Sequence, residues 1–263
     1  MKRYPYYTVL VLIFASLACG FQGANPDEPT VAPAESTETL APTDTPPATD
    51  TSTPLPTVTP DIEATAAVRA TDSAADVYSE LDRLLDNSDI SYQEGHLAWQ
   101  QADQLNIALS GPDIAILGVD KDLTAGDFIF KSDVTWEATG LLFCGAVFRS
   151  EPNLEEGKQY QFVFLRLSGL PAWTIEVHEF GYYKNSPTDV KTSQALDLRN
   201  GATNQFVLVV QDDNFTLYLN EVRQGKYYDY SKQRESGSIG FIGYQDSGSG
   251  MCKFENSWIW SLD

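Results

Sequence analysis

The chain has 263 residues and a formal net charge of −20, with 17 Lys and Arg residues against 37 Asp and Glu residues. This length is enough for one large domain or two small ones. The acidic balance argues against a nucleic-acid partner, because phosphate binding needs a cationic surface. It also argues against electrostatic docking onto anionic lipid head groups, and it predicts an acidic extracytoplasmic protein.

The first 18 residues have the pattern of a signal peptide. Lys2 and Arg3 give a positively charged start, and a short apolar run extends from Thr8 to Leu17. The run is shorter than the ~20 residues that a helix needs to cross a bilayer, so it does not predict a permanent membrane span. We therefore expect the chain to be exported.

The end of this segment predicts a lipid anchor. Ala18 followed by Cys19 resembles a bacterial lipobox, although Ser16 stands where an aliphatic residue is usual. We expect cleavage before Cys19, lipidation of its thiol, and anchoring on the extracytoplasmic face of the membrane through lipid alone. Ordinary cleavage after Ser-x-Ala is the alternative, because these residues satisfy that pattern too.

Residues 19–60 are expected to form a tether. From residue 22 onward they are rich in Thr, Pro and Ala and contain no Lys or Arg. Such a segment cannot bury enough apolar surface to offset its ordering entropy, so we expect it to be disordered. Its prolines favour extended conformations, which would hold the rest of the chain away from the membrane.

A helix is expected over residues 61–86. Pro60 suits its first turn, and an apolar stripe then recurs at spacings of four and three residues. The stripe consists of Ala70, Ala74, Val77, Leu81 and Leu84. Two interpretations remain: the helix packs on the following domain or stands as a stalk, or it forms a short coiled coil that makes the protein oligomeric.

From residue 91 the apolar period changes from 3.6 to 2, which is typical of strands. Turn residues separate the runs, and no long helix lies among them, which predicts an antiparallel sandwich or barrel over residues 91–263. The predicted strands are 105–109, 128–136, 141–148, 160–167, 173–177, 206–210, 215–219, 239–244 and 254–262. Residues 211–214 are expected to form the turn of a hairpin.

The two remaining cysteines are expected to form a disulfide, since an even pair in an exported domain favours one. Strand alternation places each of them on an apolar face, and adjacent strands would bring the two thiols within bridging range. The expected neighbours on those faces are Leu142, Ala146 and Phe148 for Cys144, and Phe254, Trp258 and Trp260 for Cys252. Two independent buried thiols are the alternative.

Three motifs near the C-terminus resemble the concanavalin A-like lectin/glucanase superfamily, which includes laminin G-like and 3-keto-disaccharide-hydrolase-type domains. They are the paired runs 204–210 and 215–220, the Gly-x-Ile-Gly strand 237–241, and the closing strand 254–260. The resemblance covers residues 91–263 and implies a jelly roll of two packed antiparallel sheets, one of them concave. Glu221 departs from the pattern, since the family often has Gly after the residue that Asn220 matches.

The sequence does not predict catalysis. Glycan-cleaving relatives carry paired carboxylates on alternate residues of one strand, where both enter the cleft. Glu176 and Glu179 are three residues apart, so alternation sends them to opposite faces. We therefore lean against an enzyme.

No cofactor or metal site is predicted. His96 and His178 are far apart in sequence and lie in no ligand-spaced motif. Asp212, Asp213 and Asp246 lie in expected turns, and calcium binding there is an alternative to ordinary solvated turns.

Aromatic side chains are the stronger indication of function, because the apolar faces of sugar rings stack on exposed aromatic rings. The candidates at strand ends and in connections are Trp173, Tyr182, Tyr183, Tyr227, Tyr228 and Tyr230. Our leading hypothesis is a noncatalytic binding module for polysaccharide or cell-wall glycan. The alternatives are a glycoside hydrolase of the same superfamily with an unrecognised site, and an adhesion or structural module that binds a surface protein.

Overall fold

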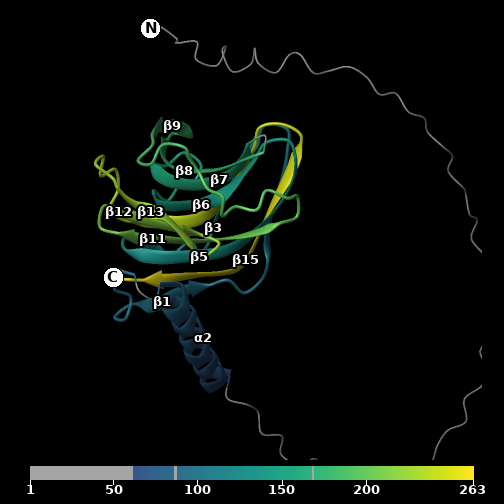
Figure 1. The fold of residues 1–263 in the computed structure, drawn as a ribbon. Coiled ribbons are helices and arrows are strands. Elements are labelled where there is room, and N and C mark those ends of the chain that lie inside the picture. The colour runs from purple at the N-terminus through teal and green to yellow at the C-terminus, as the bar shows by residue number, and fades with distance from the viewer. Residues whose placement is uncertain (1–61, 86–87, 168) are drawn as a thin grey trace, which may run out of the picture. The chain divides into compact units, whose positions relative to one another are not determined.

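The computed structural model describes residues 62–85, 88–167 and 169–263. The expected signal peptide 1–18, the lipidation site Cys19 and the tether 19–60 lie outside the described residues. Within them, one helix, α2 (Ile62–Leu85), precedes two antiparallel β-sheets (Figure 1). No helix among the described residues is long and apolar enough to cross a membrane.

The first sheet, sheet A, has seven strands in the order β1-β15-β5-β11-β12-β13, and β2 also pairs with β15. Every pairing in it is antiparallel. Its strands are β1 (His96–Gln100), β2 (Leu105–Ser110), β5 (Phe128–Thr139), β11 (Thr203–Gln211), β12 (Asn214–Leu219), β13 (Val222–Tyr228) and β15 (Ser249–Ser261).

The second sheet, sheet B, has eight strands in the order β10-β8-β7-β6-β14-β3, with β4 on β14 and β9 on β8. These pairings are antiparallel as well. The strands are β3 (Asp113–Gly118), β4 (Thr124–Ala125), β6 (Leu142–Ser150), β7 (Gln159–Leu167), β8 (Leu170–Glu179), β9 (Tyr182–Asn185), β10 (Lys191–Thr192) and β14 (Gly237–Gln245).

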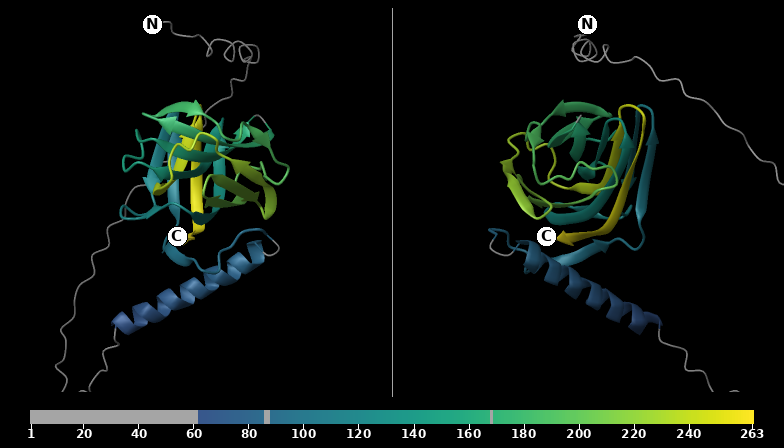
Figure 2. Two further views of the ribbon diagram at one scale, coloured as in Figure 1. Left: turned by 90° about the vertical axis from the view of Figure 1, so that its left-hand side faces the viewer. Right: turned by 45° about the vertical axis from the view of Figure 1, so that its right-hand side comes forward.

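The main core lies between the two sheets and is mostly aromatic. Alternation along β5 sends Phe128 and Trp136 inward, as the period-2 pattern predicts. There Phe128 meets Phe148 of sheet B with ring centroids 6.2 Å apart, and Trp136 meets Phe164 at 5.2 Å. The predicted fold class, an all-β antiparallel sandwich preceded by a short helix, is confirmed (Figure 2).

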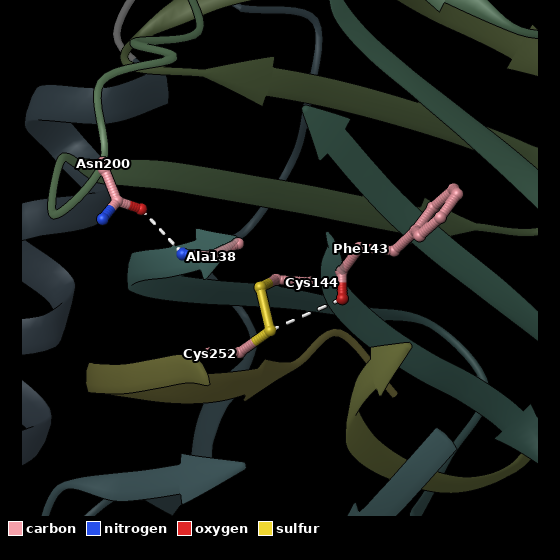
Figure 3. The surroundings of a disulfide bond; sticks show 5 residues. All are labelled: Ala138, Phe143, Cys144, Asn200 and Cys252. Carbon is pink, nitrogen blue, oxygen red and sulfur yellow. Dashed lines mark hydrogen bonds between the residues drawn. A yellow bond between two sulfur atoms is a disulfide. The ribbon is translucent and has the colours of Figure 1, made fainter. Parts of the chain in front are cut away.

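A disulfide joins Cys144 of β6 to Cys252 of β15 across this core (Figure 3). The predicted pairing is confirmed, but the expectation of adjacent strands is wrong, because β6 belongs to sheet B and β15 to sheet A. The Cα atoms lie 5.8 Å apart, and both cysteines are fully buried. The crosslink therefore fixes one sheet to the other.

A bulge in β15 shows that the face of sheet A predicted for Trp258 and Trp260 is wrong. The register runs from Glu255 opposite Asp133 to Trp258 opposite Lys131, so one partner residue on β5 faces two on β15. Asn256 takes a φ of +50° there. The extra residue reverses the alternation, so Trp258 and Trp260 face away from the main core instead of sharing the face of Cys252.

The outer face of sheet A, opposite the main core, is covered by α2 (Figure 2). Val77, Leu81 and Leu85, four residues apart, form the buried stripe of the helix. They belong to one buried cluster with Trp258, Trp260 and side chains of β5, β11 and β12. This arrangement agrees with the interpretation in which the helix packs on the domain.

Candidate functional site

Two of the predicted aromatic candidates belong to the core. Trp173 is 1% exposed and its ring lies 5.4 Å from that of Tyr227, which is itself packed against the core. Alternation along β8 turns Trp173 inward together with Ile175 and Val177. The prediction that Trp173 binds a sugar ring is therefore wrong, and the ring of Tyr227 is partly buried against the core.

Tyr182 and Tyr183 lie on β9 at the margin of sheet B, 74% and 57% exposed. Tyr183 is the cross-strand partner of His178 on β8, and the two rings meet edge to face at 6.1 Å. Partial burial is the main reason that the pKa of the Tyr183 phenol is raised, and the nearby negative charges of Glu176 and Asp189 raise it further. The structure thus combines a predicted tyrosine with a histidine that lies in no ligand-spaced motif.

Glu176 and His178 form a hydrogen-bonded pair beside this tyrosine. Since Trp173, Ile175 and Val177 face the core, these two side chains project from the outer face of sheet B. The Nε2 atom of His178 lies 2.9 Å from Oε2 of Glu176. The carboxylate therefore holds the imidazole in a fixed orientation.

Two glutamines of β7 extend the group. Gln161 is the register partner of Glu176, and Gln159 is the register partner of His178. Gln159 is 1% exposed, its Oε1 accepts a 2.8 Å hydrogen bond from Ser150, and its Nε2 has no hydrogen-bond partner among the described residues. We call Gln159, Gln161, Glu176, His178 and Tyr183 the polar row.

The acids of β8 have separate partners. Glu176 binds His178, whereas Glu179 forms a 3.2 Å ion pair with Lys184. Alternation along the strand places the two carboxylates on opposite faces. They do not form the kind of pair that a retaining glycosidase uses.

Tyr228 and Tyr230 form a second exposed aromatic group, the tyrosine pair. Their ring centroids are 4.7 Å apart in a T-shaped arrangement, and they are 41% and 88% exposed. They follow one another at the end of β13, on either side of the buried residue Asp229. Both remain candidates for stacking on a sugar ring.

A buried hydrogen-bond network holds the loop that carries the tyrosine pair. The Tyr160 hydroxyl donates to Asp229 and accepts from the backbone N–H of Gln233 at 2.9 Å. Asp229 also accepts from the backbone N–H of Ser231 at 2.8 Å. Burial raises the pKa of the Tyr160 phenol far above its usual range, and the hydrogen bond to Asp229 is the second largest cause. The phenol therefore stays a proton donor, and the loop is fixed from below.

Of the acidic turn residues considered for calcium, Asp213 has another partner. Asp213 pairs with Lys232, and that hydrogen bond is the main reason that the pKa of its carboxyl is lowered. The backbone N–H of Asp212 donates to Asp127 at 2.9 Å. Across residues 62–85, 88–167 and 169–263, no group of three or more His, Cys, Asp or Glu side chains is arranged to hold a metal ion.

No protein-family model matches the chain, and no curated protein sequence matches it. Similar solved structures include the carbohydrate-binding module CBM66 from Bacillus subtilis, at 15% identity with a TM-score of 0.43, covering 58% of this chain and 84% of that one. Sheep galectin-11 is 8% identical, with a TM-score of 0.39, and the match covers 57% of this chain and 98% of that one.

A β-glucanase from Bacillus licheniformis is 9% identical, with a TM-score of 0.42, over 61% of this chain and 79% of that one. At these identities the likeness extends to the fold alone and assigns no ligand, residue or reaction. The two packed antiparallel sheets are those that the resemblance to the concanavalin A-like lectin/glucanase superfamily implies.

Proposed function

We propose that the sandwich is a noncatalytic glycan-binding module. The observation that carries the proposal is the arrangement of the polar row, in which a hydrogen-bonded Glu176–His178 pair lies beside the exposed ring of Tyr183. A glycan presents hydroxyl groups at its rim and C–H groups on its ring faces. Fixed carboxylate and imidazole groups match the hydroxyls, and the apolar body of a tyrosine matches the C–H face.

We further propose that the module acts outside the cell as a lipoprotein. In this proposal the lipid at Cys19 is the attachment to the membrane, and residues 19–60 separate the module from it. The large acidic excess of the chain supports a neutral or cationic partner over an anionic one.

The test is affinity electrophoresis of the exported chain carrying Cys19→Ser, which cannot be lipidated, in native gels that contain a panel of polysaccharides. We expect retardation by at least one polysaccharide, lost in Glu176→Gln and in Tyr183→Ala. Tyr230→Ala is the matched control, because it removes an exposed tyrosine from the other aromatic group. Trp173→Ala is unsuitable here, since it removes a core residue.

The outcomes separate the alternatives. Loss of retardation in Tyr230→Ala but not in Tyr183→Ala would move the site to the tyrosine pair. Release of reducing ends from the same mixtures would establish a glycoside hydrolase and contradict the noncatalytic proposal. A broad panel with neither effect would favour the module that binds a surface protein.

A further inference from the structure

Strand β3 is an open edge of sheet B. It pairs with β14 on one side and with no described strand on the other. It runs in unbroken register with β14, and no residue between Asp113 and Val119 is charged. Ile114 and Leu117 are 53% and 40% exposed. A flat, apolar edge of this kind is a template for pairing with another strand.

The other described strands that pair with a single neighbour are protected against such pairing. Strand β13 carries Arg223 and Lys226 and has a register shift against β12. Strand β9 carries Lys184, β1 has a register shift against β15, and β4 and β10 have only two residues each. The exposed residues of β2 are small or polar. Charges, irregular register and short length keep an edge from pairing, so β3 is the exception among the described edges.

The pairing with β14 determines which backbone groups of β3 are open. The N–H of Val119 donates to the carbonyl oxygen of Ile239 at 3.0 Å, so the odd-numbered residues of β3 bond to β14. The N–H and C=O groups of the even-numbered residues therefore point away from β14. One of these is engaged, since the Ile114 N–H donates to Oδ1 of Asp113 at 2.9 Å. The others present both donors and acceptors to a partner strand.

We propose that β3 pairs antiparallel with β3 of a second copy of this chain. In a pairing centred on Ile116, this residue lies opposite its own copy, and Ile114 of each chain lies opposite Gly118 of the other. These are the residues whose backbone groups point away from β14, so the two strands can bond to one another through them. The contact is isologous, and it closes after two copies.

The side chains of β3 favour a second copy over an unrelated strand, because the two ends of the strand complement each other. Ile114 is large and exposed, whereas Gly118 has no side chain to oppose it. Cδ1 of Leu154 lies 3.2 Å from the position of a Cβ at Gly118, so the opposing Ile114 meets an apolar group there. At the centre, Ile116 joins the apolar clusters of the two copies, each formed on the outer face of sheet B by Val147, Val163 and Ile242.

The pairing continues sheet B across a twofold axis. The polar row lies on β7, β8 and β9, toward the opposite edge of the sheet from β3. A dimer therefore carries one polar row near each end of the joined sheet, on the same face. Two such rows would add avidity toward a repeating polymer, although the inference itself does not depend on the proposed function.

The dimer is expected to be weak and to respond to salt. One short edge is far smaller than the interface of an obligate dimer, so we expect a Kd of roughly 10–100 µM. Each copy has a formal net charge of −20, and salt screens the resulting repulsion. Association should therefore tighten as the salt concentration rises, and weakening with salt would contradict pairing through an uncharged edge.

The experiment is sedimentation equilibrium of the full exported chain carrying Cys19→Ser, over a range of protein concentrations. We expect Ile114→Lys to weaken self-association at least about tenfold, because it places a charge on the paired edge. Val222→Lys is the matched control, since Val222 is 54% exposed on edge strand β13 and gains the same charge. We expect it to change the association within about twofold.

Two outcomes of sedimentation would overturn the proposal. A chain that stays monomeric at every concentration would leave the edge to a strand of another protein, and equal weakening by the two lysine variants would place the contact elsewhere. Thermal unfolding of both variants verifies that each is folded.

A cysteine at the centre of β3 tests the register. Ile116→Cys sets two thiols opposite one another in the proposed pairing, at a Cα separation that a disulfide can span. We expect a disulfide-linked dimer on a non-reducing gel, and none from the control Val222→Cys. A linked dimer in neither variant, or to an equal extent in both, would contradict the pairing centred on Ile116.

Discussion

The apolar layers on the two faces of sheet A are held together in different ways. The inner layer lies between the sheets and combines aromatic rings of both with the disulfide. The outer layer lies between sheet A and α2, and a short stripe of the helix supplies one side of it. The inner layer therefore defines the sandwich, whereas the outer layer depends on a separate segment that can be weakened without removing strand pairing.

The largest expected effect is in the inner layer. Trp173→Ala removes a side chain that is 1% exposed and leaves a cavity against Tyr227, so we expect the free energy of unfolding to fall by about 3–5 kcal/mol. Denaturant-induced unfolding measures it. Tyr182→Ala is the control, because a 74% exposed ring should change stability by no more than about 0.5 kcal/mol. A small loss in Trp173→Ala would show that the ring is not a core element.

The disulfide tests the same layer by a different route. The cysteines are 108 residues apart, and the chain-entropy model gives up to ~4–5 kcal/mol for a loop of that size, with smaller gains often measured. We expect Cys144→Ala/Cys252→Ala to lose about 2–4 kcal/mol. Reduction of the wild-type chain is the matched measurement, because it breaks the crosslink and keeps both side chains. If reduction leaves the free energy of unfolding of the wild-type chain unchanged, the prediction is wrong.

The strands that the sequence predicts are those whose pattern is strongest. The runs 206–210 and 215–219 pair as a hairpin with Gln211 opposite Asn214, as expected. Six strands were missed, and each of them pairs with a single neighbouring strand: β1, β3, β4, β9, β10 and β13. Edge strands are paired on one side, so they bury less and keep a weaker apolar alternation. A period-2 pattern also could not predict the reversed facing of Trp258 and Trp260, because the one extra residue of the bulge moves every later side chain of β15 to the opposite face of the sheet.

The candidate site was predictable in part. Exposure of Tyr182, Tyr183, Tyr228 and Tyr230 agrees with their positions at strand ends. Burial of Trp173 follows from the alternation of β8, whereas its predicted place at the end of the strand 173–177 favoured exposure. Gln159 and Gln161 carry no motif, and their place beside Glu176 and His178 follows from strand register, which the sequence does not fix.

An intermediate effect is expected in the outer layer. Leu81 is fully buried against sheet A, and Leu81→Ala should lower the free energy of unfolding by about 2–3 kcal/mol, the lower part of the usual range because the helix can shift to fill the space. Tryptophan fluorescence should move to longer wavelength as Trp258 and Trp260 gain contact with water. Leu84→Ala, at a half-buried position of the same helix, should cost less. Equal effects of the two variants would show that α2 is rotated about its own axis, with Leu84 as deeply buried as Leu81.

The smallest expected effect is at the turn between β12 and β13, where the outer layer meets an exposed loop. Asn220 and Glu221 join Leu219 to its partner Val222 and have φ values of +47° and +66°, as in a type I′ turn. Asn220 suits this conformation and anchors the turn, because its side-chain amide donates to Ala195 at 2.6 Å.

Glu221 carries the strain, since a side chain disfavours this conformation and Gly does not. Its ion pair with Arg83 of α2 offsets little, because both side chains are more than half exposed. We expect Glu221→Gly to raise the free energy of unfolding by about 0.5–1 kcal/mol. Glu221→Ala is the matched control, because it breaks the same ion pair and keeps the side-chain strain, and it should be the less stable of the two. If Glu221→Ala equals or exceeds Glu221→Gly, the turn is not strained and the contact with the helix determines the stability at this position.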